Sequence, residues 1–201
     1  MIRIGITGGY GSGKSTAARY FEEKNYPVIY ADPLAKKLMT DDSGVRKELI
    51  SLLGNKTYNA DGRLNKEHVA SVIFSEPGKK QALERIVHPA VLAAVADFFS
   101  EIESKQSPKM AFVEAALIFE SKMDRMLDYV IAVTAPEDIR VKRIMERDGT
   151  DDEEIRKRIH AQHSDEYLKT RADFIVENSG DIDSLQQRCV YLENIFLAME
   201  Q

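Results

Sequence analysis

Glycines, a lysine and hydroxyl residues are concentrated near the start of the chain. Residues 7–17 read TGGYGSGKSTA and satisfy the pattern G-x-x-x-x-G-K-[ST]. Glycines permit backbone torsions that are closed to other residues, and they leave the amide N–H groups open to phosphate oxygens. The segment therefore predicts an anion-binding loop at the start of a helix, where the helix dipole also favours negative charge.

Each polar residue of this loop suits a nucleoside triphosphate. The backbone amides would bind the β-phosphate, Lys14 would bridge the β- and γ-phosphates, and the Ser15 hydroxyl would complete a Mg²⁺ shell. Thr16 would support the α-phosphate. The alternative is a glycine-rich turn that only caps a helix, but such a turn does not need Lys14 and Ser15 in that order. The nucleotide-binding residues expected in the loop are Gly11, Ser12, Gly13, Lys14, Ser15 and Thr16.

An acidic residue follows the second apolar run. The sequence VIYAD ends on Asp32, at the carboxyl end of an expected strand, and ligands of open α/β sheets bind at that edge. A carboxylate there can accept the proton of an acceptor hydroxyl or hold the water shell of a metal. Asp32 also precedes Pro33, which is typical of a helix N-cap. The two roles are compatible.

Three arginines share a spacing. Arg140, Arg143 and Arg147 stand at i, i+3 and i+7, which places them on one face if the segment is helical. Clustered cations repel one another unless an anion compensates, and a phosphoryl group in transfer would do so. The alternative is a solvated network in which carboxylates of the same segment neutralise them.

Other classes of nucleotide-binding protein have different sequence motifs. A switch GTPase would show a D-x-x-G sequence at the third strand and an N-K-x-D sequence. The expected third strand lacks the first and the whole chain lacks the second, which disfavours a GTPase. The glycine loop is expected to be accompanied by an acid from a neighbouring strand. The candidates for this acid are Glu114 and Glu120, near the end of the third apolar run. A strand end also needs some polar residue, so neither is assigned.

Short apolar runs alternate with helical segments along the chain. This alternation predicts a three-layer α/β fold, in which helices cover both faces of a five-stranded parallel sheet. The expected strands are residues 2–7, 27–31, 110–116, 129–134 and 173–176.

Two stretches are too long to be simple crossovers. The first is largely helical, and we expect Pro77 and Pro89 to divide it. The second contains two charged helices separated by Gly149 and is either a mobile lid or a solvated helical hairpin. The predicted organisation is a single domain, 1–201, with a core of about 1–32, 109–139 and 173–201, an insertion of about 33–108 that houses the acceptor, and a lid of about 140–172.

The composition of the chain limits the kinds of partner and compartment that we expect for it. The chain has 201 residues, 43% of them hydrophobic, and a formal charge of −5, so we expect no nucleic-acid partner. Cys189 is the only cysteine, which excludes an internal disulfide, and we expect it in the core. The apolar stretch 110–119 is shorter than the roughly 20 residues of a membrane helix. A cytoplasmic protein without a membrane partner is expected.

The chain resembles the dephospho-coenzyme A kinase family over nearly its full length. TGGYGSGKST and YAD are similar to that family's nucleotide loop and second-strand acidic motif. The block from ADGRLN to HPAV resembles its insertion. VKRIMERD, the A-Q pair at Ala161 and Gln162, and ADFIVENSG resemble its R-x-x-x-R-D, A-Q and A-D-x-x-x-x-N-x-G signatures.

This resemblance implies a P-loop kinase fold with a helical acceptor-binding insertion and a helical lid. It implies phosphorylation of the ribose 3′-hydroxyl of dephospho-CoA by ATP with Mg²⁺, in a monomer or weak homo-oligomer. Asn178 would contact adenine, or else serve only as a loop residue beside Gly180. The catalytic residues implied are Asp32, Lys14, Arg140 and Arg147.

The chain departs from the family at several positions. Tyr30 stands where a second acid is frequent, so Asp32 would have to act without it. Lys36 and Lys66 replace arginines, and lysine lacks the bidentate fork that arginine offers to phosphate. Two rival functions stay open: another P-loop kinase of a nucleoside monophosphate or metabolite, and a nucleotide-binding regulatory module.

Overall fold

The computed structural model describes residues 1–105 and 108–199. The chain divides into two compact units. The first consists of Met1–Tyr30 and Phe98–Gln201, and the second consists of Ala31–Asp97.

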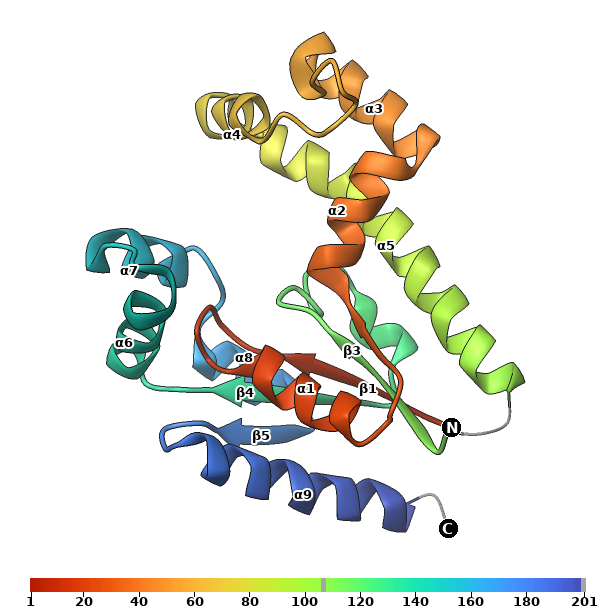
Figure 1. The fold of residues 1–201 in the computed structure, drawn as a ribbon, viewed down its shortest axis with the longest axis vertical. Coiled ribbons are helices and arrows are strands. Elements are labelled where there is room, and N and C mark those ends of the chain that lie inside the picture. The colour runs from red at the N-terminus through yellow and green to blue at the C-terminus, as the bar shows by residue number, and fades with distance from the viewer. Residues whose placement is uncertain (106–107, 200–201) are drawn as a thin grey trace. The chain divides into compact units, whose positions relative to one another are not determined.

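The first unit is built on the predicted five-stranded parallel sheet, which is confirmed. Its strand order is β2-β3-β1-β4-β5 (Figure 1). Two of the expected strands have the predicted bounds, and the other three differ by one or two residues at one or both ends. The strands are β1 (Ile2–Thr7), β2 (Val28–Tyr30), β3 (Met110–Glu114), β4 (Tyr129–Thr134) and β5 (Phe174–Glu177).

Register aligns the carboxyl ends of these strands. Glu114, the last residue of β3, is paired with Ile6 of β1 and with Tyr30 of β2. Every residue of β3 is buried, which matches its continuous apolar run, because an inner parallel strand is covered on both faces. The segments that follow the strands therefore start from one edge of the sheet, where ligands of such folds bind.

Helices cover the sheet of the first unit. α1 and α9 pack beside each other (Figure 1), and Phe21 of α1 stacks on Phe112 of β3 with ring centroids 4.1 Å apart. Cys189 of α9 is buried in the same core, as expected, and burial raises the pKa of its thiol to about 12. The helices of this unit are α1 (Lys14–Glu23), the 3₁₀ turn η2 (Met123–Met126), α6 (Glu137–Asp148), α7 (Asp152–His160), α8 (Asp165–Arg171) and α9 (Ile182–Met199).

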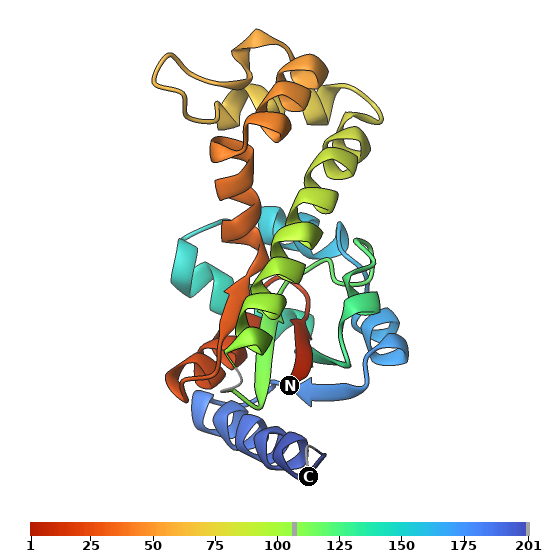
Figure 2. The same cartoon turned by 90° about the vertical axis from the view of Figure 1, so that its right-hand side faces the viewer.

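The second unit is helical and has a small core of its own, made chiefly by Leu49, Leu53 and Val69. Side chains cap two of its helices: Asp42 accepts from the Val45 amide at 2.9 Å, and a similar Asn65 bond begins α4. Its helices are the orange to yellow-green segments of Figure 2: α2 (Ala31–Asp41), α3 (Ser43–Leu53), the 3₁₀ turn η1 (Asn55–Thr57), α4 (Lys66–Ser75) and α5 (Lys79–Ser104), which continues into the first unit.

The expectation that Pro89 divides the insertion is wrong. Pro89 lies inside α5, which runs unbroken from Lys79 to Ser104 over 26 residues. A proline inside a helix costs about 3 kcal/mol because it removes one hydrogen bond and crowds the preceding turn. A long helix can bear this cost, since helical stability in proteins comes mainly from tertiary packing of the buried face. Pro77, in contrast, lies between α4 and α5, as expected.

None of the helices described in residues 1–105 and 108–199 has the length and apolar character that crossing a membrane requires.

Candidate active site

The glycine loop joins β1 to α1. Gly13 occupies the N-cap position of α1 with φ 100°, a left-handed conformation that favours glycine. A Cβ atom at Gly13 would also collide with the side-chain nitrogen of Asn178. The loop closes on itself through a 3.1 Å bond from the Ser12 amide to the Gly9 carbonyl. The loop is therefore compact and ends at the positive end of a helix, as an anion site requires.

Lys14 and Ser15 meet a carboxylate from the neighbouring strand. Lys14 Nζ lies 3.9 Å from Glu114 Oε1, and the Ser15 hydroxyl donates to the same oxygen at 3.3 Å. Both charged side chains are largely buried, 13% exposed for Lys14 and 6% for Glu114. A cation, a hydroxyl and a carboxylate thus gather where the loop begins its helix.

The sequence left two candidates, Glu114 and Glu120, for the acid that accompanies the glycine loop. The structure separates them: Glu114 joins the loop, whereas Glu120 lies 3.5 Å from His163 Nε2. The signal for Glu114 was a charged residue at the end of an otherwise apolar buried strand. Such a signal becomes specific only when the register of β3 against β1 is known.

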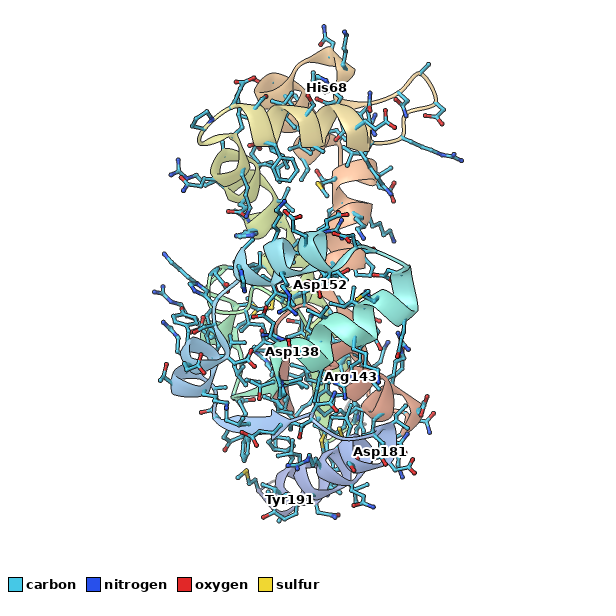
Figure 3. The ribbon with its side chains drawn as sticks, turned by 90° about the vertical axis from the view of Figure 1, so that its left-hand side faces the viewer. His68, Asp138, Arg143, Asp152, Asp181 and Tyr191 are labelled. Carbon is cyan, nitrogen blue, oxygen red and sulfur yellow. The ribbon has the colours of Figure 1, made fainter. Side chains whose placement is uncertain are left out.

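Asn178 supports the loop from the end of β5. Its side-chain Nδ2 donates to the Ser12 carbonyl at 2.8 Å, and its backbone N–H donates to the Thr134 carbonyl at 2.7 Å. Arg143, on α6 (Figure 3), donates to the Asn178 carbonyl at 2.9 Å and to the Gly180 carbonyl at 2.7 Å. Arg143, which the predicted catalytic set omits, therefore orders the segment that holds the loop.

Replacing Asn178 by alanine tests this support. Asn178→Ala leaves the buried Ser12 carbonyl without its side-chain donor, so we expect the free energy of unfolding to fall by about 1–3 kcal/mol in urea titration. Asn55→Ala, the same change at an exposed position of η1, should alter it by less than about 0.5 kcal/mol. Equal effects of the two substitutions would show that Asn178 does not support the loop.

Arg140 lies directly against the loop. It is 8% exposed, and a Cβ atom at Gly9 would collide with its Nη1. The same nitrogen is 3.5 Å from Asp165 Oδ1. Burial raises the pKa of the Asp165 carboxyl, although the Arg140 charge opposes this shift. A buried guanidinium beside a glycine loop is suited to contact phosphate oxygens.

Arg147 has a different environment from Arg140. Its guanidinium makes a bidentate pair with Asp148, with Nε–Oδ1 and Nη2–Oδ2 distances of 2.7 Å, and its side chain is 62% exposed. Hydrogen bonding to Arg147 lowers the pKa of Asp148 to about 2. For this arginine the structure matches the alternative of neutralisation by neighbouring carboxylates.

Ion pairs join the start of α6 to α7. Arg156 of α7 donates to Asp138 of α6 at 3.1 Å and to Asp152 of its own helix at 2.7 Å. Asp138 and Asp152 are labelled in Figure 3, on adjacent helices. A third bond, to Glu137 at 2.6 Å, completes the cluster. These pairs hold α6 and α7 together as one helical hairpin.

Asp32 lies in the second unit, in the first turn of α2, with its side chain exposed to solvent. The helix begins at Ala31, two residues earlier than Pro33, where it would begin if Asp32 were its N-cap. A carboxylate in the first turn is still stabilised by the helix dipole. Tyr30, where a second acid was sought, instead donates its hydroxyl to Glu22 at 2.8 Å.

At the start of α1, Gly13 leaves the backbone amides open and is followed by the Lys14 amine and the Ser15 hydroxyl. This arrangement is suited to binding the phosphates of a nucleoside triphosphate. On a parallel α/β sheet it defines a P-loop nucleotide-binding protein, a class that includes the ATP-dependent kinases. A sequence model of the dephospho-CoA kinase family matches residues 2–184. The chain therefore belongs to the dephospho-CoA kinase family.

Individual relatives agree along the whole chain. A dephospho-CoA kinase of Salinibacter ruber is 37% identical over 192 residues, which is 96% of each chain. The crystal structure of TT1252 from Thermus thermophilus has a TM-score of 0.79 at 34% identity and covers 96% of both chains. Dephospho-CoA kinase from Campylobacter jejuni has a TM-score of 0.71 at 25% identity, over 96% of this chain and 95% of its own.

Proposed function

We propose that the protein transfers the γ-phosphoryl group of ATP to the ribose 3′-hydroxyl of dephospho-CoA, giving CoA and ADP. The observation that carries this proposal is the extent of the family match, which runs over residues 2–184 and so includes the insertion and the charged helices as well as the loop. The loop alone is common to many phosphotransferases. A match over all three parts favours the same acceptor as in the family.

ATP would be held by the loop. The amides of Gly11, Ser12 and Gly13, with Thr16 at the first turn of α1, would bind the phosphate oxygens. Lys14 would neutralise charge that moves toward the leaving ADP. The buried position of its amine beside the loop supports this role, because a charge acts more strongly where water is excluded.

The Ser15 hydroxyl and the Glu114 carboxylate offer a fitting pair of ligands for Mg²⁺. Both are hard oxygen donors, and they lie 3.3 Å apart at the loop. Mg²⁺ usually takes only one or two protein oxygens and completes its shell with phosphates and water. When bound, it would neutralise charge on the phosphate oxygens of ATP.

Acceptor activation would fall to Asp32. Its carboxylate would accept the proton of the 3′-hydroxyl as the oxygen bonds to the γ-phosphorus and the bond to ADP breaks. Arg140 would stabilise the phosphoryl oxygens and exclude water, which competes with the hydroxyl. Arg147 would join it there once its guanidinium leaves the Asp148 carboxylate, to which it is paired. Asn178 would lie near the adenine. We further infer that the enzyme acts in the cytoplasm as a monomer or weak homo-oligomer, without nucleic acid or membrane.

Product analysis tests the proposal. Purified protein with MgATP and dephospho-CoA should yield a product heavier by one phosphate group, with ³¹P NMR showing a new phosphomonoester on the ribose and one ADP formed per product. The product should co-elute with CoA. Phosphorylation at another hydroxyl, or formation of ADP without a phosphorylated acceptor, would contradict the proposed reaction.

A further inference from the structure

Tyr10 is the one bulky side chain between the first and last glycines of the loop. Its backbone N–H donates to Gln162 Oε1 at 2.6 Å, and its hydroxyl donates to Asp148 Oδ2 at 3.0 Å. Asp148 is the last residue of α6, and Gln162 follows α7 by two residues. A single loop residue is thus bonded to the turn of the charged hairpin and to the segment that follows it.

The Tyr10 ring adds apolar and cationic contacts to these bonds. The Arg147 and Arg158 guanidinium carbons lie 5.8 and 6.0 Å from the ring centroid, a range in which cations are attracted to aromatic faces. The ring also packs against the apolar cluster that joins the two helices, formed by Val141, Ile144, Ile155 and Ile159. The loop and the hairpin are therefore in direct contact through Tyr10.

The bond to Gln162 differs from the others because it acts on the loop backbone. Gly9 and Gly11 flank Tyr10, and Gly11 has φ 80°, so the backbone here has few steric restraints of its own. A nest binds phosphate only when its amides keep their orientation. Gln162 holds the peptide between Gly9 and Tyr10 from outside. A glutamine that accepts from an N–H must present its carbonyl oxygen, so its orientation is also determined.

We propose that Gln162 is a positioning residue for phosphoryl transfer. Its side-chain carbonyl holds the Tyr10 amide, which keeps the loop in its phosphate-binding form and ties it to the hairpin that carries Arg140 and Arg147. This role deepens the proposed function and rests on it. It also accounts for the A-Q pair, which the roles assigned so far leave unused. Gln162 should therefore affect the binding of the triphosphate and should not affect the binding of the acceptor.

The test compares Gln162→Met with Gln186→Met. Methionine has nearly the length of glutamine but no strong acceptor, and Gln186 is an exposed glutamine of α9. Loss of this part-buried hydrogen bond predicts about tenfold weaker MgATP binding and a similar rise in the KM for ATP for Gln162→Met. The KM for dephospho-CoA should stay at the value of the unaltered protein, and the melting temperature should fall by no more than about 2–4 °C, the effect of one hydrogen bond in a chain of this size. All constants of Gln186→Met should equal those of the unaltered protein.

MgATP binding is measured by calorimetry without acceptor, so this test stands apart from the identity of the acceptor. If the unaltered protein binds MgATP but does not phosphorylate dephospho-CoA, the proposed function fails while the binding comparison still decides the role of Gln162. Unchanged MgATP affinity in Gln162→Met would overturn that role. A parallel rise of both KM values with a lower melting temperature would also overturn it, because it would indicate general destabilisation.

Discussion

Lys14→Ala is expected to lose nucleotide binding and turnover together. The amine lies at the start of α1, largely buried and 3.9 Å from the Glu114 carboxylate. Removing it leaves that buried carboxylate without its cation and the triphosphate without a charge partner. Removing one donor from a preorganised anion site costs about 10²- to 10³-fold in kcat, and we expect a loss of at least this size in kcat/KM. Calorimetry with MgATP and an ADP-release assay measure the two effects.

Lys24→Ala is the matched control. Lys24 is an exposed lysine at the opposite end of the same helix, so its loss removes the same charge without touching the loop. Its MgATP affinity and kcat should equal those of the unaltered protein. Wild-type affinity for MgATP in Lys14→Ala would mean that the loop does not hold the triphosphate through this lysine.

Asp32→Asn should lower turnover far more than ATP affinity. An amide keeps the shape of the carboxylate but cannot take the proton of the acceptor hydroxyl. General-base catalysis contributes about 10²- to 10⁴-fold, so we expect kcat to fall within that range while the Kd for MgATP changes by less than about twofold. Single-turnover measurement of product formation separates this chemical step from product release.

Asp41→Asn serves as the control for this substitution, because Asp41 is an exposed aspartate at the other end of α2. It should keep normal kcat. Near-normal turnover in Asp32→Asn would reduce Asp32 to a residue that stabilises the first turn of α2. Equal losses of turnover and of MgATP affinity would instead assign the carboxylate to the metal's water shell.

The parts of the fold that the sequence predicts well are those with local signals. β1 and β4 have the expected bounds because each is a short apolar run between polar residues. α6 and α7 are separated by Gly149 in a left-handed turn, as its position suggests. The prediction for Pro89 was wrong because it treated proline as a local helix breaker. The length and packing of α5 instead decide whether the helix continues through Pro89.

The sequence predicts the part of the site that lies in one continuous segment, and it does not predict the contacts between distant segments. The glycine loop is read from eight consecutive positions, but Ser15 meets Glu114 from 99 positions away, and Tyr10 meets Gln162 from 152 positions away. Such contacts depend on strand order and register, which no local pattern contains. The shared spacing of the arginines likewise did not show that Arg140 faces the loop while Arg147 pairs with its neighbour Asp148.

The central claim is that the loop's triphosphate is passed to a ribose alcohol and is not simply hydrolysed. ADP release at saturating MgATP should be measured without acceptor, with dephospho-CoA, and with a panel of nucleoside monophosphates and sugar alcohols. The account predicts slow release alone, a large increase with dephospho-CoA, and little change with the rest of the panel. ADP release that is the same with and without dephospho-CoA, or that rises most with a nucleoside monophosphate, would contradict it.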